Sequence, residues 1–193
     1  MRRAPAAGLS LIEVLFALSL TLAAAGAGIP ALLEINRAVR LRSGASFVSG
    51  YLQRARLDAI RRSRMVGVRF RPAGTDWLMS VYVDGNGNGV RTADILSGTD
   101  VLLDAEIALS ARAASIRFAR LPDVPDVNGA SGGDAVRFGT SAIASFASDG
   151  SASSGSLYLT DGRSQIAVTV TPATGRVRLR RWDSRLRMWS QIR

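Results

Sequence analysis

Residues 8–33, GLSLIEVLFALSLTLAAAGAGIPALL, carry the strongest structural signal in the chain. Glu13 is the single charged residue of the run over 9–33, and nearly all the others are apolar or small. At about 1.5 Å per residue, a helix of this length can span a hydrocarbon core of about 30 Å. Arg2 and Arg3 precede the run, as in the charged start of an export signal. The sequence therefore predicts a membrane-spanning helix over 9–33.

Three interpretations of this apolar segment are open. An ordinary secretory signal would be cut after small residues, for which Ala23-Ala24-Ala25 is suitable. A plain membrane anchor would stay uncut. In both cases Glu13 is a costly carboxylate in apolar surroundings, and it has no purpose there. The third interpretation is an anchor that is processed near its start and uses Glu13, and it alone accounts for the glutamate.

Gly8-Leu9-Ser10-Leu11-Ile12-Glu13 resembles the processing motif of type IV prepilins, which has a glycine, a hydrophobic first mature residue and a glutamate as the fifth. With Leu9 as mature residue 1, Pro30 falls at mature position 22, where pilins commonly have a helix-kinking proline. The family usually begins with phenylalanine or methionine, so Leu9 departs from the pattern. The resemblance implies that prepilin peptidase cuts after Gly8 and methylates the new amine. It also implies that Glu13 pairs with the N-terminal amine of a neighbouring subunit during assembly.

The hydrophobic period changes downstream of the apolar run. Over 34–64, apolar side chains recur at spacings of three and four residues, which predicts an amphipathic continuation of the same helix. This stripe consists of Ala38, Leu41, Ala45, Val48, Leu52, Ala55 and Ala59. Pro30 removes one backbone hydrogen bond, so we expect the helix to bend near it.

From residue 65 onward, short alternating segments are separated by turn residues, which predicts antiparallel strands. The expected strands are Val66–Phe70, Trp77–Val83, Ser115–Phe118, Ser156–Thr160, Gln165–Thr171 and Arg176–Trp182. The expected turns and loops are 72–74, 84–89, 122–134, 161–162 and 172–175. The predicted fold class is α+β, with a long N-terminal helix packed on an antiparallel β-sheet.

Residues 52–60, LQRARLDAI, resemble the helix end of the GspH/FimT-type minor pilins and pseudopilins. Trp77, the Asp/Asn/Gly turn after its strand, Phe146–Gly150 and the Gly-Arg-Val-Arg of 175–178 follow in the order of the same family. The resemblance implies four segments along the chain. They are a leader over 1–8, a transmembrane and assembly helix over 9–33, its amphipathic continuation over 34–64, and an exported β-rich domain over 65–193.

The same resemblance implies a minor subunit at or near the tip of a type IV pilus or a type II secretion pseudopilus. Its partners would be prepilin peptidase, the inner membrane, and other major and minor pilins or pseudopilins. The precursor would lie in the bacterial inner membrane with its C-terminal domain in the periplasm. A second function is open, because some family members are implicated in binding incoming DNA during natural transformation. The sequence does not separate a pilus from a secretion pseudopilus.

Charge and composition narrow the functional classes. The formal net charge is +10, and all 25 basic residues are arginine. The arginines concentrate in 37–71 and 176–193, whereas 72–161 is net negative. This asymmetry fits a polyanionic partner or an anionic membrane surface, and it fits equally an arginine-rich protein with solvated faces. Because cysteine and histidine are absent, familiar nucleophilic arrangements are incomplete, and we expect a protein that is not an enzyme and needs no cofactor.

The C-terminal segment 175–182, GRVRLRRW, is the candidate DNA-binding site. On a strand, Arg176, Arg178 and Arg180 would share one face at intervals of about 6.6 Å, opposite Val177 and Leu179. A row of guanidinium groups can contact successive phosphates without reading bases. Arg181 adds charge, and Trp182 and Trp189 are candidates for stacking on single-stranded bases. The alternative is an edge strand whose charges prevent aggregation.

Residues 84–89, DGNGNG, are a candidate calcium loop. Asp84, Asn86 and Asn88 place oxygen side chains at alternate positions, and a glycine follows at the sixth, as in the first half of an EF-hand. The twelfth position is Ile95, where a bidentate glutamate would be required. The alternative is a glycine-rich hairpin, because Asn-Gly is a strong hairpin signal.

Overall fold

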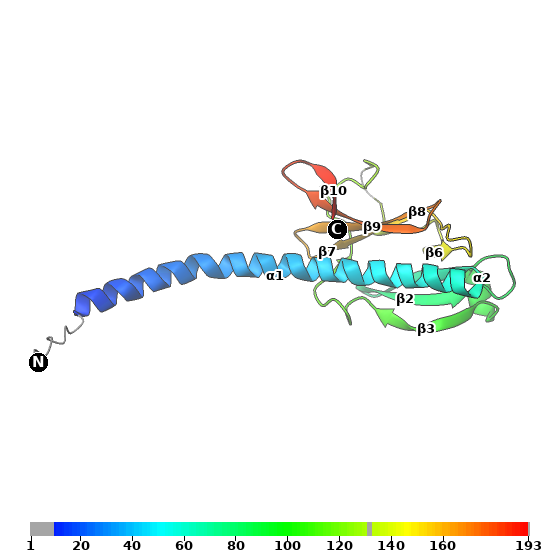
Figure 1. Cartoon of the computed structure of the whole chain (residues 1–193), viewed down its shortest axis with the longest axis horizontal. Helices are drawn as coiled ribbons and strands as arrows, with labels where there is room; N and C mark the ends of the chain where they lie inside the picture. The colour runs from blue at the N-terminus through cyan, green and yellow to red at the C-terminus, as the bar shows by residue number, and fades with distance from the viewer. Residues whose placement is uncertain (1–9, 131–132, 193) are drawn as a thin grey trace, which may run out of the picture. The chain divides into compact units, whose positions relative to one another are not determined.

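The computed structural model describes residues 10–130 and 133–192, so Gly8 and Leu9 lie outside the described residues. The chain divides into two compact units, Met1–Ala38 and Val39–Arg193. Figure 1 labels the helices and most of the strands. The elements are α1 (Leu11–Arg62), β1 (Val66–Ala73), β2 (Asp76–Val83), α2 (Thr92–Ser97), β3 (Val101–Ala108), β4 (Arg117–Phe118), β5 (Val136–Arg137), β6 (Ile143–Phe146), β7 (Gly155–Thr160), β8 (Gln165–Thr171), β9 (Arg176–Asp183) and β10 (Met188–Ile192).

The first unit contains the beginning of α1. The carbonyl of Ser10 accepts hydrogen bonds from the backbone N–H groups of Glu13 and Val14, and the helix runs uninterrupted through the position of Pro30. Its large apolar side chains are exposed, namely Leu11, Ile12, Val14, Leu15, Phe16, Leu18, Leu20, Leu22, Ile29, Leu32, Leu33 and Ile35. The sequence predicts a membrane span over 9–33. Among the described residues, no helix is both long enough and apolar enough to cross a membrane.

In the second unit, α1 presents one apolar face to the core. The predicted stripe is buried from Leu41 to Ala59, and Tyr51 is buried beside it. Small residues on this face let neighbouring backbone approach closely. A Cβ added at Gly44 would lie 3.1 Å from the Cβ of Ala113, which belongs to the loop after β3. The amphipathic pattern therefore predicts correctly which face of this helix is buried.

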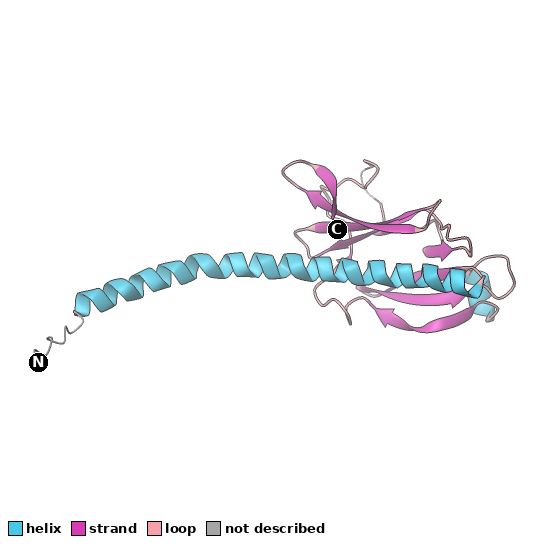
Figure 2. Ribbon diagram, in the orientation of Figure 1, coloured by secondary structure: helices cyan, strands magenta, loops and turns pink. Residues whose placement is uncertain are grey.

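Two antiparallel sheets pack against one side of the second half of α1 (Figures 1 and 2). Their strand orders are β3-β2-β1-β6 and β10-β9-β8-β7-β4, and β5 pairs with β7. Alternate side chains of both sheets join the helix in one buried cluster, which includes Val66, Val68, Phe70, Leu157, Leu159, Ile166, Val168 and Val170. The helix-on-antiparallel-sheet class is therefore confirmed, with two sheets where the sequence predicts one.

Several elements differ from the sequence prediction. Strand β1 continues through Pro72 and Ala73, and the chain turns at Gly74, which has a φ of +63°. Elements α2, β3, β5, β6 and β10 are not predicted. The sequence of β3 lacks a clear apolar–polar alternation because it contains Asp104 and Glu106. These carboxylates form ion pairs with Arg54 and Arg71, at 3.3 and 2.7 Å.

Candidate functional site

The arginine row of β9 has the predicted alternation. Val177 and Leu179 pack against the core, so Arg176, Arg178 and Arg180 project from the opposite face of the strand. Arg181 follows the parity of Val177 and Leu179 and therefore lies on the other face. The structure thus separates the four predicted DNA-binding arginines into a row of three and one residue that faces away from them.

Strand β9 is an internal strand over much of its length. From Leu179 to Asp183 it pairs with β10 on one side, and over Arg176–Arg181 it pairs with β8 on the other. Protection of an exposed sheet edge therefore does not account for Arg180 and Arg181.

The guanidinium groups of the row have no ion-pair partner among the described residues. Within residues 10–130 and 133–192, the arginine–carboxylate pairs are Arg54–Asp58, Arg54–Asp104, Arg71–Glu106 and Arg137–Asp126. Arg176 is exposed, and Arg178 and Arg180 are half-buried. These charges are available to an external anion, because none of the three arginines forms an ion pair within the described residues.

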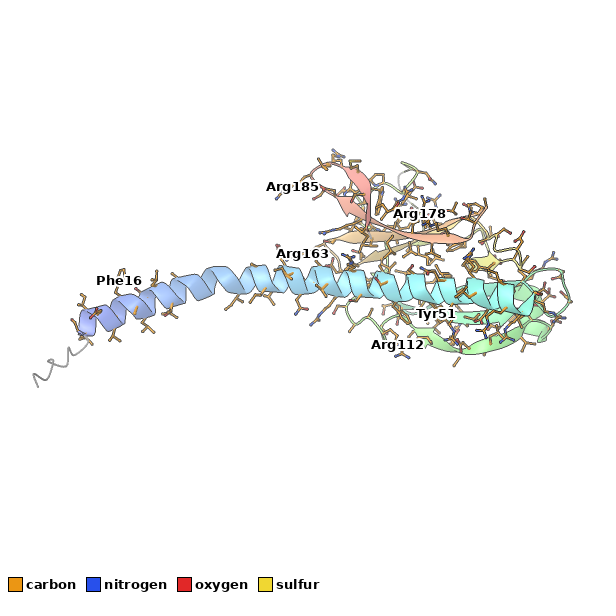
Figure 3. The ribbon with its side chains drawn as sticks, viewed as in Figure 1. Phe16, Tyr51, Arg112, Arg163, Arg178 and Arg185 are labelled. Carbon is orange, nitrogen blue, oxygen red and sulfur yellow. The ribbon has the colours of Figure 1, made fainter. Side chains whose placement is uncertain are left out.

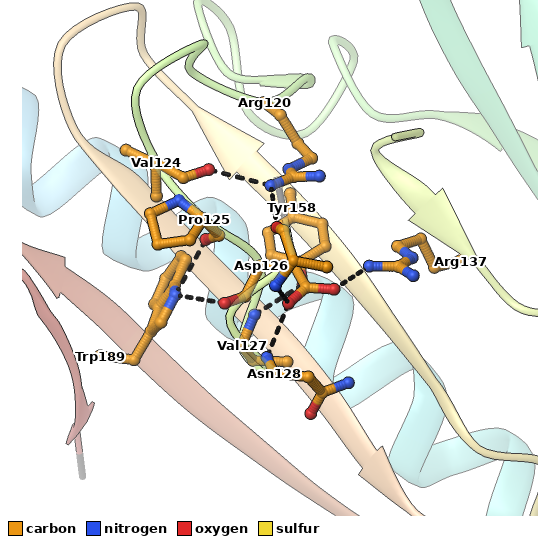
Figure 4. Close-up of polar contacts among 10 residues, drawn as sticks. Arg120, Val124, Pro125, Asp126, Val127, Asn128, Arg137, Tyr158 and Trp189 are labelled. Carbon is orange, nitrogen blue, oxygen red and sulfur yellow. Dashed lines mark hydrogen bonds and ion pairs between the residues drawn. The ribbon is translucent and has the colours of Figure 1, made fainter. Parts of the chain in front are cut away.

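The side chain of Trp189 is hydrogen-bonded to the loop over 122–134, which bears on its predicted role in base stacking. Its indole N–H donates to the carbonyl oxygens of Pro125 and Asp126 at 3.1 and 3.2 Å (Figure 4). Its ring lies 6.0 Å from that of Tyr158 and 5.5 Å from that of Trp182. Base stacking by Trp189 would require these contacts to break, so Trp182 is the better candidate of the two.

Asp126 organises the loop that Trp189 contacts. The carboxylate is 2% exposed and accepts hydrogen bonds of 2.8 Å from the backbone N–H groups of both Asn128 and Ala130. It also pairs with the guanidinium of Arg137 (Figure 4). Burial opposes ionisation of this carboxyl, but the hydrogen bonds and Arg137 outweigh it and lower the pKa of Asp126.

The sequence predicts an ordinary surface loop at 122–134 and misses this cluster. Arg120 closes the cluster from another side, because its guanidinium lies 5.1 Å from the Tyr158 ring centroid and donates to the carbonyl of Val124 at 2.9 Å. The signal that was available is Asp126-Val127-Asn128-Gly129, in which an aspartate can bond the backbone two residues on.

The candidate calcium loop uses its acidic side chain, Asp84, in hydrogen bonds to its own backbone. The buried Asp84 carboxylate accepts backbone N–H groups from Asn86, Gly87 and Gly89 at 3.1, 2.8 and 2.8 Å. Burial opposes ionisation of Asp84, but these hydrogen bonds outweigh it and lower its pKa. The side chains of Asn86 and Asn88 are exposed.

The loop leads into α2 and β3, so it is not a hairpin. The described residues contain no group of three or more acidic, histidine or cysteine side chains placed to hold a metal ion. Calcium binding through Asp84, Asn86 and Asn88 stays a prediction.

A long N-terminal helix packed on antiparallel sheets defines a pilin-like α+β protein. The chain belongs to the GspH family, because the family model described as type II transport protein GspH matches residues 47–174. This is a family of structural pseudopilin and minor pilin subunits of type II secretion, not of enzymes. Comparison with curated proteins and with solved structures gave no significant match. The arginine row of β9 lies beyond the matched residues.

Proposed function

We propose that the chain is a prepilin-like precursor anchored in the inner membrane, whose mature form joins a secretion pseudopilus or a pilus at or near its tip. The observation that carries this proposal is the exposed apolar surface of α1. Leu11, Ile12, Val14, Leu15 and Phe16 are all exposed, and successive helical positions point in directions about 100° apart. A helix that is apolar on every side needs lipid or other apolar helices around it.

Glu13 has the role of a register signal in this proposal. It is exposed in the first turn of α1, among apolar side chains. Once surrounded by lipid or by neighbouring helices, its carboxylate needs a cationic partner, and cleavage after Gly8 would create an amine close to it in sequence. The amine of an adjacent subunit would satisfy the carboxylate only when the two helices have the correct axial offset.

Two substitutions test processing and assembly separately. With Gly8→Asp, we expect the precursor to remain uncut, because the added side chain blocks close approach of the backbone to a protease; intact-mass spectrometry would show the leader retained.

With Glu13→Gln, we expect normal cleavage, but the amount of the subunit recovered in sheared filaments should fall at least about tenfold, because one member of a buried charge pair is removed.

Glu34→Gln is the matched control for Glu13→Gln, because Glu34 is an exposed carboxylate on the same helix. Filament yield equal to that of the parent in Glu13→Gln would contradict the assembly role. If the parent protein, without substitutions, keeps the full mass of the precursor, the processing step is contradicted.

DNA binding is the second candidate function, and the unpaired arginine row of β9 favours it. Three guanidinium groups on one strand face can neutralise about three phosphates. Such binding would be insensitive to base sequence and sensitive to salt, because it releases condensed counterions from the nucleic acid. A subunit with this property would be a DNA receptor of an uptake pilus.

A fragment of residues 37–193, which contains the whole second unit, is expected to retard DNA in a gel. Replacing Arg176, Arg178 and Arg180 with alanine should make the negative slope of log K, the DNA-binding constant, against log salt concentration shallower by about 3. The control is the triple alanine variant of Arg61, Arg62 and Arg91, which removes the same charge from exposed positions. If both triple variants lose affinity equally, net charge and not the row carries the binding.

A further inference from the structure

The arginine row of β9 ends at an aromatic residue. Trp182 follows Arg180 by two positions on the same strand, so its side chain leaves the sheet on the same face as the row. Figure 3 shows Arg178 on the side of β9 that faces away from α1. Adjacent members of this line are about 6.6 Å apart. The row and Trp182 therefore form one line of side chains, cationic along most of its length and aromatic at one end.

The strands on both sides of β9 add polar side chains to this face. Cross-strand partners in an antiparallel sheet share a face, and the register pairs Arg178 with Thr169 of β8. On the other side it pairs Arg180 with Gln191 of β10, which is exposed. Sheet surfaces that combine cationic, polar and aromatic side chains are well suited to single-stranded nucleic acid, whose phosphates and bases are both accessible.

Trp182 is held in place by Trp189. The two residues are direct cross-strand partners, and their rings meet edge to face with centroids 5.5 Å apart. Trp189 is fixed in turn by its indole N–H, which donates to two carbonyl oxygens of the loop over 122–134 (Figure 4). Trp182 itself is half-buried, so part of its surface is open to solvent. The aromatic end of the line is therefore preorganised, and a base that stacks on it would cost little side-chain entropy.

We propose that this face binds single-stranded DNA in preference to duplex DNA, with Trp182 stacking on one base and the arginine row contacting the phosphates beside it. The proposal rests on the DNA-binding function proposed above and specifies the form of the nucleic acid. Guanidinium contacts to phosphates do not distinguish the two forms, since both carry phosphates along each strand. Stacking does, because bases inside a duplex already stack on their neighbours, and only an unpaired base can cover the Trp182 ring.

Two single-stranded probes of equal length and charge test the stacking. One is oligothymidylate, and the other has the same sugar–phosphate backbone with an abasic spacer in place of every base. The full chain in neutral detergent should bind oligothymidylate at least about tenfold more tightly, because only this probe can stack on Trp182. A duplex of the same length, compared at equal phosphate concentration and physiological salt, should also bind about tenfold more weakly than oligothymidylate. Fluorescence anisotropy of the labelled probes gives the three dissociation constants.

Two substitutions at Trp182 separate the aromatic ring from its apolar packing. Trp182→Phe keeps a ring and should keep most of the preference for oligothymidylate. Trp182→Leu keeps apolar bulk without a ring and should bring the two single-stranded probes to equal affinity. The matched contrast is Arg176→Ala/Arg178→Ala, which should weaken the binding of both probes alike and leave the ratio of their dissociation constants unchanged.

The outcomes separate this preference from the function on which it rests. A parent protein that binds the two single-stranded probes equally, or binds duplex as tightly as oligothymidylate, overturns the preference for unpaired bases but leaves phosphate binding by the row standing. A Trp182→Leu variant that keeps the ratio of the parent overturns Trp182 as the stacking residue. A parent protein that binds none of the three probes refutes the DNA-binding function itself, and the preference with it.

Discussion

Replacing Leu52 with alanine is expected to lower the free energy of unfolding of the second unit by about 3 kcal/mol or more. Leu52 is fully buried on α1 and belongs to the cluster that joins the helix to both sheets. Its removal loses the transfer free energy of the side chain and leaves a cavity between layers that cannot close fully. The corresponding fall in the melting temperature is about 10 °C.

Leu57→Ala is the control, because Leu57 lies on the same helix and is 55% exposed. It should change the free energy of unfolding by no more than about 0.5 kcal/mol. Denaturant unfolding of the 37–193 fragment, followed by circular dichroism, gives both values. Equal effects of the two substitutions would contradict the assignment of the buried face of α1.

Sequence periodicity predicts this helix well, because one physical requirement sets it. A helix that packs on a core needs apolar residues every three or four positions, and Leu41 to Ala59 satisfy this without exception. Strands such as β8 are predicted for a similar reason, since β-branched residues bounded by turn residues are typical of buried strands. Edge strands lack that signal. In β3, exposed Val101 and Leu102 and the acidic residues that pair with distant arginines hide the pattern.

The candidate site was predictable only where it depends on local geometry. Strand alternation gives the shared face of Arg176, Arg178 and Arg180. It also gives the opposite orientation of Arg181. The hydrogen bonds of Trp189 join residues more than 60 positions apart. Contacts of this kind follow from the tertiary arrangement of the sheet, and no periodicity records them.

Replacing Asp126 with alanine is expected to lower the free energy of unfolding at neutral pH by about 3 kcal/mol. The substitution leaves the backbone N–H groups of Asn128 and Ala130 without their acceptor and leaves Arg137 without its partner. The side chain of Arg137 is 41% exposed, so water screens the ion pair, and the lost hydrogen bonds account for most of the effect. Asp123→Ala, at an exposed position of the same loop, is the control.

The pH dependence of this loss identifies its cause. Because the fold lowers the pKa of Asp126, the carboxylate stabilises the native state fully above the unfolded pKa of about 4, and that contribution disappears as the pH falls through the folded pKa. The difference between the parent and Asp126→Ala should therefore shrink in acid. Asp126→Asn keeps an oxygen that can accept both backbone N–H groups, so it should lose less than Asp126→Ala at neutral pH. A difference that stays constant from pH 7 to pH 2 would contradict an ionised Asp126 as the organiser of this loop.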